Sequence, residues 1–137
     1  MPGSAFGKFL AVFCVAVMLF PVVSFADTPE EAEKIWNELN RKVVNAYHQG
    51  KYREGIKWAE KALAHAQKHF GAEDQNTLTS INNLAMLYLQ NGYYDKTEPL
   101  LKKALALSEK VLGPEHPDTL MTLNNLGLYR FTVEISH

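Results

Sequence analysis

The stretch GPEHPDTLMTLNNLG, residues 113–127, decides the fold, because nearly the same stretch, GAEDQNTLTSINNLA, stands 42 residues earlier at 71–85. The sequence KALA at 61–64 returns at 103–106 with the same offset. Self-similarity at a fixed period of roughly 20–50 residues is typical of repeat architectures, in which each repeat is one supersecondary unit. The sequence therefore predicts an array of 42-residue repeats.

Each repeat is predicted to form two helices. Apolar residues recur at helical spacing, and a glycine follows each run, as is common just after a helix C-terminus. The helices are expected at residues 29–48, 52–70, 76–91, 94–112 and 117–130. Neighbouring helices are expected to approach closely at small residues on the apolar faces: Ala62, Ala85, Ala104 and Gly127. This predicts an all-α domain over residues 27–131, with residues 132–137 as a disordered tail.

The first 26 residues differ in composition from the rest. Lys8 precedes an uncharged apolar run at 9–25, and small residues occupy positions 24 and 26. A basic start, an apolar middle and a small-x-small end are typical of a secretory signal peptide. We therefore expect residues 1–26 to be cleaved and the protein to be exported, either periplasmic or secreted. The alternative is an uncleaved membrane anchor, for which the run is shorter than the roughly 20 apolar residues that span a bilayer.

The composition argues against several functions. Fourteen basic and fifteen acidic residues give a formal net charge of −1, which does not favour nucleic-acid binding. The single cysteine, Cys14, lies in the apolar run, so we expect no disulfide and no thiol nucleophile in the exported chain. His65 and His69 have a spacing that can hold zinc, but they lack the glutamate of a zinc-protease motif and are interpreted as exposed surface residues. We expect no catalytic activity, metal or cofactor.

The repeat resembles a known family. The small residue at the eighth helical position, the Gly before Tyr at the turn and the Ala in the second helix resemble tetratricopeptide repeats. The period, with GPEHPDTLMTLNNLG and EPLLKKALAL (98–107), is similar to the kinesin-light-chain type. The resemblance covers about residues 39–129. It implies an α-α superhelix of about two and a half repeats that binds a protein or peptide partner without catalysis.

The first helix of each pair has a face that the core does not use, and in a superhelix these faces line the concave side. An Asn side chain offers one acceptor and two donors, which match a peptide main chain. The resemblance implies that Asn at these positions holds bound peptide. Arg41 is a candidate for a carboxylate, and Met86 for adaptable apolar contact. The candidate binding residues are Asn40, Arg41, Asn82, Asn83, Met86, Gln90, Asn124 and Asn125. The same faces also carry Asn37, Val44, His48, Thr79, Met121 and Leu128.

Two alternatives remain open for these surfaces. In each Asn pair, one side chain is expected in the groove and the other to be partly structural, bonding a neighbouring helix or loop. In the last repeat, apolar residues are expected to lack a covering helix: Leu123, Leu126, Tyr129 and Phe131. Exposed apolar patches favour association. The alternative function is therefore a structural piece completed by a partner or by a second copy, as in a homodimer.

Overall fold

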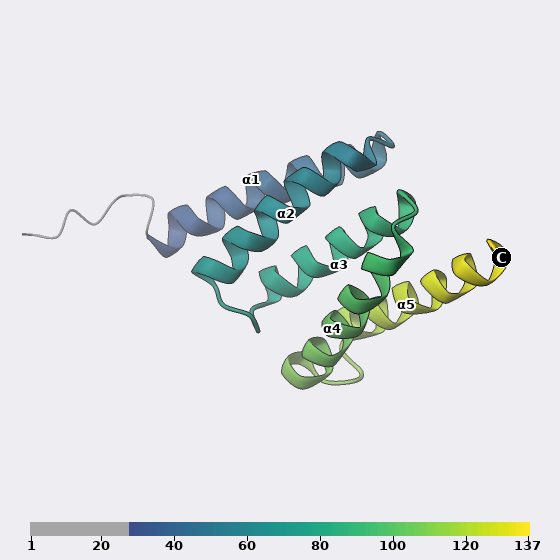
Figure 1. Ribbon diagram of the computed structural model, residues 1–137. Coiled ribbons are helices and arrows are strands. Elements are labelled where there is room, and N and C mark those ends of the chain that lie inside the picture. Colours follow the sequence, from purple (N-terminus) through teal and green to yellow (C-terminus); the bar gives the residue numbers. More distant parts are fainter. Residues whose placement is uncertain (1–27) are drawn as a thin grey trace, which may run out of the picture.

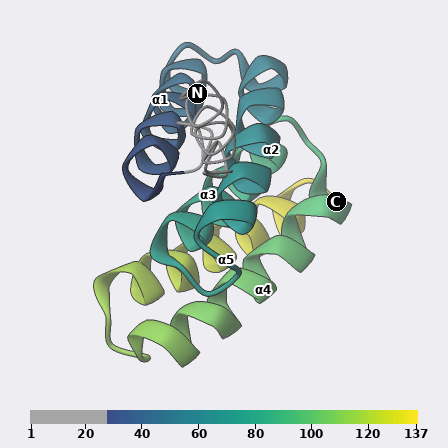
Figure 2. The same ribbon diagram turned by 90° about the vertical axis from the view of Figure 1, so that its left-hand side faces the viewer.

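A computed structural model describes residues 28–137, and these form five α-helices (Figure 1). They are α1 (Pro29–His48), α2 (Tyr52–His69), α3 (Gln75–Gln90), α4 (Tyr94–Leu112) and α5 (Pro117–Ile135). Each helix packs against the next, and α3 also contacts α1 and α5 (Figure 2). This confirms the all-α array of helix pairs. The predicted signal peptide lies outside the described residues.

Glycines end the helices and keep the connections short. Gly50, Gly71, Gly92 and Gly113 all have positive φ, between 69° and 94°, a conformation that glycine adopts without a Cβ clash. The last connection leads into His116, the N-cap of α5, whose Nδ1 accepts from the backbone N–H of Asp118 at 3.1 Å. The turn residues of the repeat therefore serve to stop one helix and start the next.

The core follows the apolar faces, with one exception among the small residues. Ala62, Ala85 and Ala104 are buried between helices, as expected. Gly127 is exposed, and a Cβ added there would meet nothing within 4 Å. The expectation of close helix approach at Gly127 is wrong, because no described helix packs against that side of α5.

Helix α5 runs to Ile135 rather than ending near residue 130. The disordered tail expected for 132–137 is thus corrected, since Val133 packs against the apolar cluster between α4 and α5. Leu126 and Tyr129 are buried in that cluster and do not lack cover. Of the described helices, none is long and apolar enough to cross a membrane.

His65 and His69 are half-buried rather than exposed. His65 Nε2 lies 2.7 Å from the carbonyl oxygen of Ala32, which joins α2 to α1. The two rings lie 4.4 Å apart between centroids. His65 therefore takes part in the packing of α2 on α1, and His69 lies beside it on α2, which corrects their interpretation as exposed surface residues.

Candidate functional site

A hollow of about 260 Å³ lies on the face that α1, α3 and α5 share. It is lined by Val43, Val44, Tyr47, His48, Asn82, Asn83, Met86, Leu87, Met121 and Asn125. The first helices of the three repeats therefore meet around one concave site. Its wall combines apolar side chains with three amides.

The first two repeats are linked by an asparagine pair. Asn83 Nδ2 donates to Asn40 Oδ1 at 2.8 Å, from α3 to α1. The bond uses one donor proton of Asn83 and leaves its Oδ1 without an intramolecular partner within the described chain. Asn83 is thus both a tie between helices and a lining residue of the hollow.

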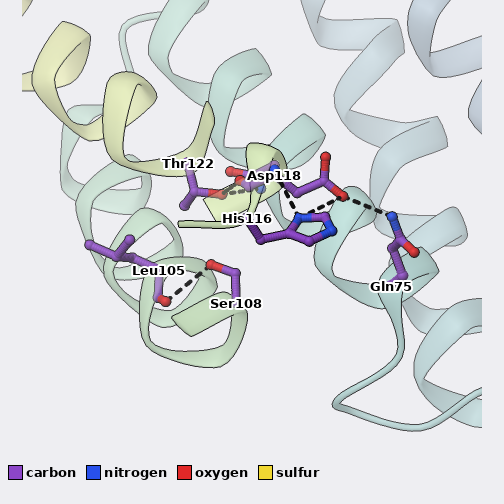
Figure 3. A network of polar contacts seen from close by, with 7 residues as sticks. Gln75, Leu105, Ser108, His116, Asp118 and Thr122 are labelled. Atoms are coloured by element: carbon purple, nitrogen blue, oxygen red, sulfur yellow. Dashed lines mark hydrogen bonds and ion pairs between the residues drawn. The ribbon is translucent and has the colours of Figure 1, made fainter. Parts of the chain in front are cut away.

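Asn82 is held in a different way. Its side chain is 5% exposed, and Nδ2 donates to Thr122 Oγ1 of α5 at 2.8 Å. Thr122 Oγ1 in turn donates to the carbonyl oxygen of Asp118 at 2.9 Å. Figure 3 shows Thr122 and Asp118 at the start of α5, where Asp118 also accepts from Gln75 of α3 at 2.8 Å. These bonds join α3 to α5.

The buried carbonyl oxygen of Asn82 is unsatisfied. Within residues 28–137, Asn82 Oδ1 has no hydrogen-bond partner. Thr122 has a single hydroxyl proton, which goes to Asp118, so it can only accept from Asn82. The amide is therefore oriented with Nδ2 toward Thr122 and with Oδ1 enclosed in the packing.

The structure brings together only part of the predicted set. Asn82, Asn83, Met86 and Asn125 line the hollow, and Asn40 joins them through its bond to Asn83. Three candidates do not line it and are exposed: Arg41, Gln90 and Asn124. Asn124 instead lines a second hollow on α5, beside Leu123 and Phe131. Asn125 lines the first hollow and Asn124 the second, so the two asparagines of the last repeat face different surfaces.

Val43, Tyr47 and Leu87 complete the lining of the first hollow, and they are not among the residues expected there from the sequence. All three pack in or against the cluster between α1, α2 and α3. Their apolar character indicated a core position, and nothing in the periodicity separates a core residue from one at the floor of a groove. The difference depends on how α1 and α3 are placed relative to each other, which only the structure gives.

Perturbed titratable groups lie outside this site. Burial, together with a 3.0 Å hydrogen bond to Glu60, raises the pKa of Tyr88 to about 12. A hydrogen bond from Lys102 lowers the pKa of Glu98 on α4. Of the residues that line the hollow, none is Asp, Glu, Lys or Arg. The site is thus close to neutral, with His48 at its edge.

Comparison with protein families gives two matches, both described as tetratricopeptide repeat. One covers residues 31–96, from α1 to the start of α4, and belongs to the kinesin-light-chain-like type. The other covers 77–118, the period that contains α3 and α4. Curated proteins gave no significant match. Such repeats are generally non-catalytic modules that bind other proteins. With five helices packed in adjacent pairs and matches that together span residues 31–118, this chain belongs to the tetratricopeptide repeat family.

Proposed function

We propose that the concave face of α1, α3 and α5 binds an extended peptide segment of a protein partner through its asparagine side chains. The observation that supports this proposal most directly is the hollow, in which amides from α3 and α5 border an apolar surface. Amides offer donors and acceptors to a main chain whatever side chains it bears. Met86 and Met121 add flexible apolar contact.

The size of the hollow supports a peptide side chain as its occupant. About 260 Å³ is many times the roughly 10–15 Å³ that one water needs. It is also slightly below the roughly 300–1,000 Å³ that is usual for a small-molecule pocket. A peptide lying along the face would place one or two side chains in it.

Panning a library of random twelve-residue peptides on the full chain tests this proposal. Enriched peptides are synthesised and their affinity is measured by fluorescence anisotropy. Met121→Glu, which places a charge in the hollow, is expected to weaken the binding of these peptides at least about tenfold, or by about 1.4 kcal/mol. The absence of any enriched peptide would reject the proposal.

Leu120→Glu is the matched control. Leu120 is the neighbour of Met121 on α5 and has a similar exposure, 51% against 48%. It lines the second hollow, not the first. Equal losses in both variants would place the peptide elsewhere than in the groove.

We further propose that the protein is exported. The support is the sequence of residues 1–26, with Lys8, an apolar run and small residues at 24 and 26. Edman sequencing of the protein recovered outside the cytoplasm is expected to begin at Asp27. A chain that keeps Met1 and stays with the membrane fraction would instead support an uncleaved anchor.

The apolar side of α5 favours a second candidate function, association through that helix. Leu123 and Phe131 are 51% and 60% exposed. They border a hollow together with Leu120, Asn124, Gly127 and Leu128. The equivalent side of α3 packs on α4, so this side of α5 has the chemistry to receive a helix from a partner or a second copy.

Light scattering behind a sizing column tests the second candidate. A mass that rises with concentration, and that returns to one chain in Phe131→Glu, is expected if α5 pairs with a second copy. A constant monomeric mass across a wide range of concentration would reject the pairing of α5 with a second copy.

A further inference from the structure

The two sides of the helix array differ in charge. The first hollow lies among α1, α3 and α5, and no residue of α2 or α4 lines it. Among the described helices, α3 contacts both α1 and α5, whereas α2 and α4 do not contact each other. Helices α2 and α4 therefore form the side away from the hollow, which we call the convex side. Residues 51–69 include five Lys or Arg and two Glu, although the formal net charge of the chain is −1.

Four of these cations form one row along α2, and we call them the basic stripe: Arg53, Lys57, Lys61 and Lys68. All four are exposed. At about 100° per residue they lie within about 40° of one line parallel to the helix axis, and at about 1.5 Å per residue the row is about 22 Å long. It runs opposite the buried alanines of the helix. The basic stripe therefore points directly away from the core.

No carboxylate neutralises the basic stripe. Within residues 28–137, none of its four side chains forms an ion pair. The two glutamates of α2 are engaged beside the row. Glu60 accepts from Tyr88 of α3 at 3.0 Å, and Glu54 accepts from Trp58 at 3.5 Å. Lys61 Nζ lies 4.8 Å from the centre of the Trp58 ring, a contact that leaves its charge at the surface. Four uncompensated positive charges thus face the solvent.

The repeat itself does not require these charges. The equivalent positions of α4, 42 residues later, are Asp95, Pro99, Lys103 and Lys110. Lys110 forms an ion pair with Glu73, so the row on α4 is close to neutral. Helix α4 nevertheless packs between α3 and α5 as α2 packs between α1 and α3. The fold therefore does not explain the charge of the basic stripe.

We propose that the basic stripe is a docking surface for a membrane that contains anionic lipid. The inference goes beyond the proposed function, because it concerns the convex side and not the groove. Clusters of about four to eight Lys or Arg on one helix are typical of contact with anionic lipid headgroups. A straight row of exposed cations can lie along such a surface over its whole length.

The composition of the basic stripe argues against an acidic protein as its partner. Protein interfaces contain few lysines at their centre and depend on aromatic or arginine side chains that are seated in pockets. Three of the four cations here are lysines, and the residue between Lys61 and Lys68 on the same line is Ala64. Lipid headgroups need neither a pocket nor an apolar anchor, because the attraction acts between charges near the surface.

The number of cations sets the expected strength of binding. One Lys or Arg near an anionic surface strengthens binding about fivefold. Four of them together correspond to half-saturation near about 1 mM accessible lipid. Binding is therefore weak and reversible, and it should decrease as salt is added, because exposed charges are screened over about 8 Å at physiological ionic strength.

Lysine acetylation followed by mass spectrometry tests this surface on the full chain. The probes are vesicles of phosphatidylglycerol and phosphatidylcholine in equal parts, with pure phosphatidylcholine vesicles as the reference. At about 10 mM accessible lipid, Lys57, Lys61 and Lys68 are expected to react at least about fivefold more slowly on the anionic vesicles than on the reference. Lys103 should change by less than about twofold. Each lysine is measured separately, so the comparison holds whatever residues 1–26 contribute to vesicle binding.

Lys61→Gln and Lys103→Gln are matched variants, because each removes one charge at the same position of the repeat. The lipid concentration that gives half of the protection at Lys57 is expected to rise about fivefold in Lys61→Gln and by less than about twofold in Lys103→Gln. Circular dichroism verifies that both variants keep their helices. Lys68→Gln is a second variant of the basic stripe, and it should produce the same shift as Lys61→Gln.

Three outcomes would overturn the inference. Equal protection of Lys57 and Lys103 would mean that the basic stripe is not the contact. Equal protection on pure phosphatidylcholine would mean that lipid charge is not recognised. Protection of Lys57 by soluble poly-glutamate or inorganic phosphate, but not by anionic vesicles, would assign the basic stripe to an acidic protein or to a free anion. None of these lysines lines the first hollow, so each outcome leaves the proposed peptide binding unaffected.

Discussion

Helices α3 and α5 hold the same place in successive repeats, but among the helices of residues 28–137, α3 has neighbours on both sides and α5 on one. Ile81 on α3 is 1% exposed, whereas its equivalent Leu123 is 51% exposed. Leu89 packs in the cluster with Leu101 of α4, whereas its equivalent Phe131 lies open. The repeat sets which side chains face a neighbour, and the neighbour alone decides whether they are buried.

The largest expected effect comes from truncating the equivalent apolar pair. Ile81→Ala removes a fully buried side chain and leaves a cavity, which should lower the free energy of unfolding by about 2–5 kcal/mol. Leu123→Ala removes a half-exposed side chain and should change it by less than about 0.5 kcal/mol. Urea unfolding followed by circular dichroism measures both. Similar losses would mean that another helix or a second copy covers α5 in solution.

Much of the fold could be predicted from the sequence, because apolar residues at helical spacing mark the buried face of each helix. The five helices and the concave position of Asn82 and Asn83 follow from the 42-residue repeat. The bond from Asn82 to Thr122 could not be predicted, since it depends on how closely two helices lie that are 40 positions apart in the chain. The prediction for Gly127 was wrong for the same reason. Its position in the repeat indicates a close contact with a neighbouring helix, but no described helix makes that contact.

A smaller loss of stability is expected when the hydrogen bond that ties α3 to α1 is removed. Trp36→Phe keeps most of the buried ring and removes the donor to Ser80 Oγ. Ser80 still donates to Asn76, so the loss should be about 1 kcal/mol, as for one ordinary hydrogen bond. Thermal unfolding of the variant beside Trp58→Phe, whose ring nitrogen makes an exposed 3.5 Å contact, provides the control. A larger loss in Trp58→Phe would contradict the role given to Trp36.

Gly127→Ala should change stability in the opposite direction from the other two variants. The added methyl meets nothing within 4 Å, and alanine is favoured over glycine inside a helix by about 0.5–1 kcal/mol. Unfolding by urea should therefore shift to higher concentration. The reverse change at the equivalent position on α3, Ala85→Gly, should destabilise, because Ala85 is fully buried. A destabilised Gly127→Ala would indicate a closely packed partner on that side of α5.

The smallest effect on stability at neutral pH is expected from the ionisation of the two tyrosines that tie α3 and α5 to the preceding helices. Tyr88 donates to Glu60 at 3.0 Å and Tyr129 to Glu98 at 3.3 Å. Burial raises the pKa of both phenols, that of Tyr88 from 10.0 to about 12. A phenol whose pKa is raised by folding stabilises the folded state fully below its unfolded pKa and loses this contribution as the pH rises through the folded value.

Stability should therefore be unchanged by Tyr88 ionisation up to about pH 10 and should fall between about pH 10 and 12. Ultraviolet absorbance of phenolate against pH measures this in the wild type, in Tyr88→Phe and in Tyr129→Phe. The step near pH 12 should be missing in Tyr88→Phe and should remain in Tyr129→Phe. If the step near pH 12 remains in Tyr88→Phe, it belongs to another tyrosine, and burial with the bond to Glu60 does not raise the pKa of Tyr88 as expected.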